Sequence, residues 1–330
     1  MNDSMNNDTL VIGLPSKGRL EANSLTYFAR AGLGVVKQDG RGYNGRLQGV
    51  NNVEVVFLSA DEIAQRLGNG GLHMGVTGED LIYERIEKPE LSVEPMARLG
   101  FGHATVAVAV PKSWIDVRLM VDLDEVAWGF RTRYGRQMRI ATKYTRLTRN
   151  FLSRHGVTNY RIVESAGATE GAPGIGSAEF IVDITSTGAT LAANNLKLLE
   201  DGVILKSEAV LMACLVASWS TPTLTAAAEV LAMIMARKRA ASMVEVRFVH
   251  KGVDVGFLSS LTERFGVMTS FPREGTAQDV VIVYCPREQL HPLVAWLQKD
   301  GSQTVTASFP DYIFTADNEG YDRLLARLNG

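Results

Sequence analysis

The sequence has 330 residues, of which 46% are hydrophobic and 21% are charged. This composition is that of an ordinary globular chain of about two domains, and it excludes wholesale disorder, which needs low hydrophobicity and high net charge. The formal net charge is -2, so the chain as a whole has no electrostatic preference for nucleic acid or for an anionic membrane surface.

Several absences narrow the class of protein further. No apolar run approaches the about 18 residues that a membrane span needs, and residues 1–10 contain no basic segment of the kind that opens a secretory signal. The two cysteines, Cys214 and Cys285, are far apart and lie outside any C-x-x-C pair, which argues against a zinc site or a disulfide framework. We therefore predict a cytoplasmic protein without nucleic-acid or membrane partners.

Short apolar segments alternate with helical patterns through the first 240 residues. After a lead that we predict to be disordered (residues 1–8), we predict strands at residues 9–14, 53–58, 74–76, 104–110, 139–142, 161–163, 179–184 and 208–216. Helices are predicted at residues 20–31, 60–67, 147–155, 190–199 and 222–239. This alternation favours a parallel α/β core, in which ligands bind beyond the carboxyl ends of the strands.

The pattern changes after a boundary that we place at residues 239–243. A strand at residues 243–250 and a helix at residues 255–265 precede two strands at residues 267–271 and 279–284. A helix (residues 288–298) and a strand (residues 304–309) follow, and a last helix is predicted at residues 321–328. The β-α-β-β-α-β order predicts a ferredoxin-like α+β module.

The most informative segment combines a strand end, an acidic residue, a loop of small residues and a predicted helix. Asp183 ends the strand, Gly188 gives the loop conformational freedom, and hydroxyls surround it at Thr185, Ser186, Thr187 and Thr190. Successive backbone N–H groups at such a helix start can bind phosphate without a cationic side chain. Asp183 and the upstream Glu170 can accept hydrogen bonds from a sugar diol, so the segment suits a ribose 5-phosphate. Taken alone, the same loop is also an ordinary capped turn.

The wider spacing around this loop resembles the signature of the ATP phosphoribosyltransferases, the first enzymes of histidine biosynthesis. The matching positions are Glu170, Gly176, Ala178, Ile181, Asp183, Ile184, Thr187, Gly188, Thr190 and Leu191. Further segments similar to that family are residues 14–20 (LPSKGRL), 75–81 (GVTGEDL), 99–102, 139–144 and 205–209. The resemblance covers about residues 9–240. It implies a two-lobed core like that of the periplasmic solute-binding proteins, with one lobe at about residues 9–105 and 195–240 and the other at about residues 106–194.

The resemblance also implies a reaction and a set of roles. The family joins N1 of the adenine of ATP to C1 of phosphoribosyl pyrophosphate (PRPP), with Mg²⁺ held mainly by the pyrophosphate. By that resemblance, the PRPP site comprises Glu170, Asp183, Thr185, Ser186, Thr187, Gly188, Ala189 and Thr190. The ATP side would comprise Thr77, Gly78, Asp80 and Leu81. Lys17, Arg19 and Arg46 would stabilise charge that develops on the leaving pyrophosphate.

Some positions stay open at this stage. Arg41 and Lys143 are equally compatible with phosphate contacts and with solvated surface charge. His73 and Ser59 stand where relatives usually have Asp and Arg, and a lone histidine is more often structural, so we assign His73 no chemistry. Regulation is open as well, because the core resembles the short form of the enzyme while the module at residues 241–330 has the element order of the long form's regulatory domain.

That element order motivates the hypothesis that histidine inhibits the enzyme through the C-terminal module; the alternative is an assembly module without a ligand. The family also implies a homo-oligomer, either a dimer or a hexamer, and for the short form a separate regulatory subunit. Two other functions remain possible from sequence alone: a two-lobed small-molecule-binding or sensing protein, and a phosphoribosyltransferase for another base. The second usually has two adjacent acidic residues before its loop, whereas here Val182 precedes Asp183.

Overall fold

The computed structural model describes residues 8–38, 43–165, 167, 169–250, 253–269, 279–302 and 304–329. Most of the predicted disordered lead, and Arg41, lie outside the described residues. The chain divides into two compact units. The first contains Met1–Ala29, Gly34–Ala226 and Leu324–Gly330, and the second contains Arg30–Leu33 and Ala227–Arg323. No helix among the described residues is long and apolar enough to cross a membrane.

The first lobe of the first unit is built on a seven-stranded sheet. In spatial order its strands are β2 (Val35–Lys37), β3 (Asn44–Leu47), β4 (Val53–Leu58), β1 (Leu10–Pro15), β5 (Met74–Gly78), β12 (Ala209–Cys214) and β6 (Val93–Arg98). All six residues of β1 are buried, as expected for an apolar strand with neighbours on both sides and covered faces. The helices of the first lobe are α1 (Gly18–Arg30), α2 (Ala60–Gly68), α3 (Glu79–Arg85) and α4 (Pro89–Ser92).

Helices α2 and α3 cover one face of this sheet through apolar side chains such as Ile63, Leu67 and Ile82. The start of α2 is fixed by Ser59, whose hydroxyl accepts the backbone N–H of Glu62. Such a cap is worth about 1 kcal/mol. The residue that departs from the usual family pattern therefore has a structural role here.

The second lobe is built on a five-stranded sheet. In spatial order its strands are β11 (Leu196–Ser207), β7 (Ala104–Pro111), β10 (Phe180–Thr185), β8 (Met138–Thr142) and β9 (Tyr160–Glu164). Helices α5 (Met120–Tyr134) and α6 (Thr145–Arg154) pack on one face through a core that includes Leu123, Leu152 and Phe180. A one-turn 3-10 helix, η1 (Thr169–Gly171), precedes β10, and α7 (Ala189–Ala193) follows it.

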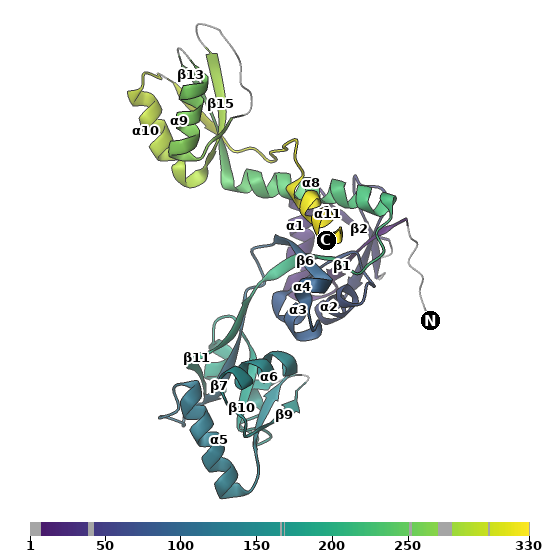
Figure 1. Ribbon diagram of the computed structural model, residues 1–330, viewed down its shortest axis with the longest axis vertical. Coiled ribbons are helices and arrows are strands. Elements are labelled where there is room, and N and C mark those ends of the chain that lie inside the picture. The colour runs from purple at the N-terminus through teal and green to yellow at the C-terminus, as the bar shows by residue number, and fades with distance from the viewer. Residues whose placement is uncertain are drawn as a thin grey trace. The chain divides into compact units, whose positions relative to one another are not determined.

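The two lobes are connected twice, between β6 and β7 and between β11 and β12, and Figure 1 shows β7 and β11 side by side at this crossing. These crossing strands add antiparallel pairs to the parallel α/β core that the sequence predicts. Strands β4, β1 and β5 are parallel, as are β10, β8 and β9. The strands that connect the lobes run antiparallel to their neighbours: β7 to β10 and β11, and β12 to β5 and β6.

The predicted helix at residues 190–199 is wrong over its second half. Helix α7 ends at Ala193, and Asn195 adopts a left-handed conformation with φ 56°, which asparagine tolerates better than most residues. The chain then enters β11, which pairs with β7. Residues 196–207 consequently belong to the second sheet, whereas the sequence placed the return to the first lobe at residue 195.

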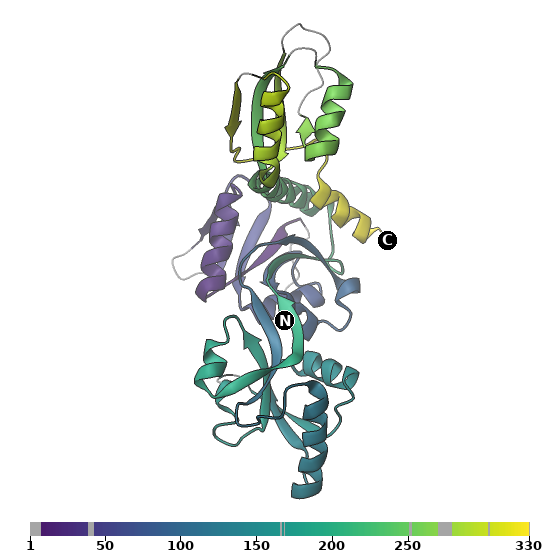
Figure 2. The ribbon, with the colours of Figure 1, turned by 90° about the vertical axis from the view of Figure 1, so that its left-hand side faces the viewer.

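The second unit contains a four-stranded antiparallel sheet in the order β14 (Met268–Thr269), β15 (Asp279–Pro286), β13 (Met243–His250) and β16 (Val305–Ser308). Helices α9 (Val255–Phe265) and α10 (Leu290–Lys299), the latter after the short η2 (Arg287–Gln289), pack on one face of it (Figure 2). This is the strand order of a ferredoxin-like fold. The long helix α8 (Thr221–Ser242) leads into this sheet, and α11 (Glu319–Leu328) follows it.

Candidate functional site

A cleft of about 690 Å³ opens in the first unit and is lined by residues from both lobes. It lies beyond the carboxyl ends of β5 and β10, where ligands are expected in such sheets. Nine residues that the sequence proposed for the site line it: Arg19, Gly78, Asp80, Leu81, Thr185, Ser186, Thr187, Gly188 and Thr190. The first four come from the first lobe and the other five from the second.

The loop between β10 and α7 is shaped by two local features. Gly188 has φ 75°, the left-handed region in which residues with a Cβ are strained. The backbone N–H of Gly188 donates to the Thr185 hydroxyl at 2.9 Å, while that of Ala189 reaches the Thr187 hydroxyl at 3.4 Å. The hydroxyl groups of Thr185 and Thr187 therefore act partly within the loop, by fixing its backbone, and the exposed Ser186 and Thr187 face the cleft.

Asp183 and Glu170 form a pair of carboxylates just behind this loop. Asp183 is half-buried on β10 and accepts a hydrogen bond from the hydroxyl of Thr169 in η1. Burial raises the pKa of Asp183, and the negative charge of Glu170 raises it further, while the Ile184 backbone N–H and the Lys143 ammonium lower it. The carboxylate therefore takes up a proton more readily than an exposed aspartate.

Asp80 is almost fully buried and connects the two lobes. Its Oδ2 accepts the hydroxyl of Tyr144 at 2.7 Å, and its Oδ1 accepts the hydroxyl of Ser207 at 2.8 Å. Ser207 also receives the Asp80 backbone N–H at 3.1 Å. A side chain at Gly78 would collide with the Asp80 carboxylate, so the glycine is required for this approach. Burial and the Asp80 charge both raise the pKa of Tyr144, which keeps the phenol protonated as the donor.

One turn further along α3, Glu84 makes a second connection between the lobes. Its carboxylate, buried in the fold, accepts the backbone N–H groups of Arg146 and Leu147, each at 3.0 Å. The N–H groups in the first turn of a helix have no acceptor within the helix, and Glu84 supplies that acceptor for α6. Because residues four apart lie on one face of a helix, Asp80 and Glu84 direct two carboxylates of α3 at the second lobe.

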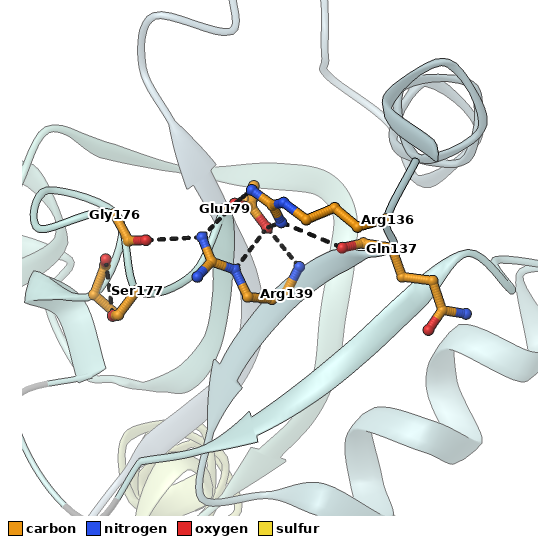
Figure 3. A network of polar contacts seen from close by, with 7 residues as sticks. Arg136, Gln137, Arg139, Gly176, Ser177 and Glu179 are labelled. Atoms are coloured by element: carbon orange, nitrogen blue, oxygen red, sulfur yellow. Dashed lines mark hydrogen bonds and ion pairs between the residues drawn. The ribbon is translucent and has the colours of Figure 1, made fainter. Parts of the chain in front are cut away.

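A network of ion pairs and hydrogen bonds stabilises residues 176–179, which precede β10 (Figure 3). Glu179 accepts the guanidinium groups of Arg139 at 2.8 Å and Arg136 at 3.0 Å, and Arg139 also donates to the Gly176 carbonyl at 2.7 Å. Burial by itself raises the pKa of Glu179, but the hydrogen bonds from Arg139 and Arg136 outweigh it and hold the pKa at about 2. Arg139, which the sequence noted only as part of a family-like segment, thus stabilises the loop that carries Glu170.

Six proposed residues are not among the described residues of the cleft lining: Lys17, Arg46, Thr77, Glu170, Asp183 and Ala189. Thr77 is fully buried, and its hydroxyl donates to the Ala60 carbonyl at the start of α2. Lys17 is exposed beside the cleft residue Arg19, and Arg46 is exposed on β3 near the undescribed residues 39–42. Among the described residues, no group of three or more His, Cys, Asp or Glu side chains is placed to hold a metal ion.

The cleft also contains residues that sequence reasoning missed or left undecided. Asn23 on α1 and His103 at the crossing to β7 line it, although neither was singled out. Lys143 and Tyr144 line it as well, which resolves Lys143 as a cleft residue rather than a remote surface charge. Both belong to the family-like segment at residues 139–144, and both come directly after a predicted strand.

Comparison with known proteins gives consistent results. The sequence profile of the ATP phosphoribosyltransferase family matches residues 59–236. A protein from Nitrobacter winogradskyi named ATP phosphoribosyltransferase is 50% identical over 317 residues, which is 96% of this chain and 97% of that protein. One of the same name from Nitrobacter hamburgensis is 51% identical over 97% of this chain and 98% of its own length. These relatives therefore span the second unit as well.

Among solved structures, an ATP phosphoribosyl transferase complex (HisG:HisZ) from Thermotoga maritima is similar with a TM-score of 0.48 and 24% identity, covering 62% of this chain and 87% of that chain. A periplasmic binding protein from Brucella ovis with glutathione bound is similar with a TM-score of 0.41 and 10% identity, covering 71% of this chain and 67% of that chain.

Proposed function

The chain belongs to the ATP phosphoribosyltransferase family, and we propose that the cleft of its first unit is where ATP and PRPP react. In this reaction N1 of adenine attacks C1 of PRPP and pyrophosphate leaves, which gives N1-(5-phosphoribosyl)-ATP, the first intermediate of histidine biosynthesis. The observation that carries the proposal is the convergence of residues 185–188, Thr190 and the start of α3 on one cleft, within the region that the family profile matches.

We assign the 5-phosphate of PRPP to the loop at Thr185–Thr190. The loop offers backbone N–H groups and hydroxyls and contains no cationic side chain, so phosphate would be held by dipoles. Glu170 and Asp183 would then accept the ribose hydroxyls. Their half-buried position behind the loop suits a neutral diol, since hydrogen bonds to a sugar do not require either carboxylate to be fully exposed.

On the opposite side of the cleft, we assign the adenine of ATP to the start of α3. Gly78 and Leu81 present backbone and an apolar side chain to the cleft. Asp80, whose two carboxylate oxygens already accept protein hydroxyls, would hold this wall in place, and the buried Thr77 would support it from behind.

The chemistry requires charge stabilisation more than acid–base catalysis. Adenine N1 supplies the electron pair for the new bond, and the C1–O electron pair leaves with pyrophosphate, so negative charge grows on the leaving group. Arg19 lines the cleft and Lys17 and Arg46 are exposed on the same lobe, and we assign these cations to the phosphates. Loss of one such preorganised charge typically lowers the rate about 10²–10³-fold.

Mg²⁺ is the proposed cofactor, and the pyrophosphate oxygens of PRPP would provide most of its ligands. When bound there, the ion offsets the charge of the leaving group. The carboxylates of Glu170 and Asp183 lie close enough for each other's charge to matter, and hard oxygen donors of this type suit Mg²⁺ or its waters. The residues present thus fit the ion.

The direct test of this site separates the two substrates. We expect Asp183→Asn to raise the KM for PRPP far more than the KM for ATP, with pyrophosphate release as the readout. An equal rise in both KM values would show that Asp183 does not serve the ribose. If wild-type protein released no pyrophosphate and instead bound an unrelated solute tightly, the binding-protein alternative would replace the enzyme assignment.

Regulation and assembly form a second part of the proposal. We propose that the ferredoxin-like second unit binds histidine and inhibits the enzyme, and that the protein works as a homo-oligomer, a dimer or a hexamer; a separate regulatory subunit is the alternative arrangement. The support is the strand order of this unit and its presence within the span of the relatives. Histidine titration of the full chain should reduce turnover, and the same inhibition after deletion of residues 242–330 would contradict the role of the second unit.

A further inference from the structure

Lys143 is a cation of the second lobe that faces the cleft. It follows β8 directly, is exposed, and lines the same cleft as Arg19 from the first lobe. Its positive charge acts on Asp183, whose pKa it lowers. Residues 185–190, the proposed phosphate loop, contain no lysine or arginine, so Lys143 provides cationic charge in the second-lobe wall that this loop itself lacks.

The neighbouring tyrosine holds Lys143 in this position. The Lys143 Nζ lies 5.0 Å from the centroid of the Tyr144 ring, within the range of a cation–π contact. The Tyr144 side chain is 1% exposed, and its hydroxyl donates to Asp80 in the other lobe at 2.7 Å. Since the ring is buried and its hydroxyl is hydrogen-bonded, the ring is a fixed surface for the ammonium group.

The place of Lys143 relative to Asp183 indicates which part of the substrate it meets. If Glu170 and Asp183 accept the ribose hydroxyls, the 2-hydroxyl lies next to C1, the carbon that carries pyrophosphate. Ala141 of β8 lies opposite Ile181 of β10 in a parallel pair, so Lys143 leaves the sheet at the level of Asp183. We therefore place this cation at the C1 end of the ribose and away from the 5-phosphate. When the C1–O bond breaks, its electron pair moves onto a pyrophosphate oxygen beside this cation.

We propose that Lys143 is a catalytic residue that contacts the leaving pyrophosphate from the second lobe, and that Tyr144 is the residue that positions it. The proposal rests on the function proposed above. The step requires no proton transfer by Lys143, because adenine N1 provides the attacking electron pair and the leaving group takes the pair from C1. Arg19 on the first lobe and Lys143 on the second thus meet the phosphates from opposite walls.

The first test compares three variants of the full chain by pyrophosphate release. Lys143→Gln should lower kcat about 10²-fold, whereas Lys143→Arg, which keeps the charge, should recover at least about a tenth of the wild-type rate. Lys112→Gln, an exposed lysine of the same lobe outside the described cleft lining, is the control and should match wild type. Wild-type turnover by Lys143→Gln, or no recovery by Lys143→Arg, would overturn the inference. Absence of turnover in the wild type itself would instead contradict the proposed function.

A second readout reports the charge of Lys143 directly. The groups that face Asp183 are Glu170, Lys143 and the Tyr144 phenol. Removing the lysine charge takes away a stabiliser of the carboxylate, so the acid limb of kcat/KM for PRPP should move to higher pH in Lys143→Gln and stay in place in Lys143→Arg. An unmoved acid limb in Lys143→Gln would mean that the ammonium does not sit beside the ribose site.

A double-mutant cycle tests the role of Tyr144. Tyr144→Phe removes the hydrogen bond to Asp80 and should lower kcat in the presence of Lys143. In the Lys143→Gln background the same change should have little further effect, since residues that act together are not additive. Full additivity would show that Tyr144 does not act through Lys143.

Discussion

Both ring nitrogens of His73 are hydrogen-bonded to the backbone of the first lobe. The Nδ1 accepts the N–H of Val11 at 3.1 Å, so the proton resides on Nε2, which lies 3.1 Å from the Ser218 carbonyl. The ring also packs edge-on against Trp219. Burial lowers the pKa of His73 despite the opposing effect of the Ser218 carbonyl. The histidine that departs from the family pattern is therefore a neutral structural residue.

This gives a testable pH dependence. Below its ordinary pKa of about 6.5, His73 takes up a proton in the unfolded chain but resists one in the fold, so stability is lost as the pH falls from there. The contribution to the slope cannot exceed about 1.4 kcal/mol per pH unit, the limit for one proton. We expect the unfolding free energy of wild type to fall more steeply between pH 7.5 and pH 5.5 than that of His73→Gln, measured by urea unfolding. Parallel curves for the two proteins would contradict this account.

The phosphate loop allows a matched test at a glycine. Gly188 in the loop and Gly135 after α5 have φ 75° and 65°, and a Cβ at either would meet no atom within 4 Å. Alanine should cost about 1–2 kcal/mol at each through backbone strain alone. Only Gly188→Ala should also raise the KM for PRPP, about tenfold, with a smaller change for ATP. Equal KM values for PRPP in the two variants would show that the loop does not bind PRPP.

At the scale of residues, the sequence indicates groups of consecutive residues, but not the contacts between residues that are far apart in the chain. The loop at residues 185–190 could be singled out from the sequence because its residues follow one another, and all but Ala189 line the cleft. The bond from Tyr144 to Asp80 spans 64 positions, and that from Ser207 to Asp80 spans 127. No local pattern connects such residues, and each alone is an ordinary residue near a strand end.

Among the secondary-structure elements, α3 shows how one short helix fixes two lobes. Its seven residues place Asp80 and Glu84 one turn apart, and each binds a different part of the second lobe. Glu84 provides the N-terminal cap of α6, which has no side-chain cap of its own. The contact between the lobes at the cleft is therefore continued by a second contact one turn further along the same face of α3.

Removing this cap should destabilise the protein measurably. Glu84→Ala leaves two buried N–H groups of α6 without their acceptor and should cost about 2 kcal/mol. Glu87→Ala, at an exposed residue just after the helix, is the control and should stay within about 0.5 kcal/mol of wild type. Chemical unfolding of both variants checks the difference, and an equally small loss in both would argue against the cap.

Element prediction succeeded for apolar strands and failed where context decides. Strand β1 is apolar throughout and β4 is apolar except for Glu54, and both were predicted within a residue of their bounds. The start of β11 reads Leu-Lys-Leu-Leu, which fits helix and strand equally, and only its pairing with β7 makes it a strand. Helix α5 was not predicted, because its buried residues Met120, Leu123 and Ala127 are diluted by exposed Val121 and Trp128.

For the whole molecule, the division into two compact units agrees with the about two domains expected from a length of 330 residues. The first unit contains both lobes and the cleft, and the second contains the ferredoxin-like sheet. The near-zero net charge fits an enzyme that binds polyphosphates through a few local groups. Among the described cleft residues, the groups that we propose for this binding are the loop at residues 185–190 and cations such as Arg19 and Lys143.

The measurement that tests the central claim most directly is pyrophosphate release from PRPP and Mg²⁺ with each of several acceptors, together with the mass of the product. We predict release with ATP, and a product equal in mass to phosphoribosyl-ATP, with no release when ATP is replaced by free adenine, another purine base or a pyrimidine. Release with one of those bases and none with ATP would contradict the assignment.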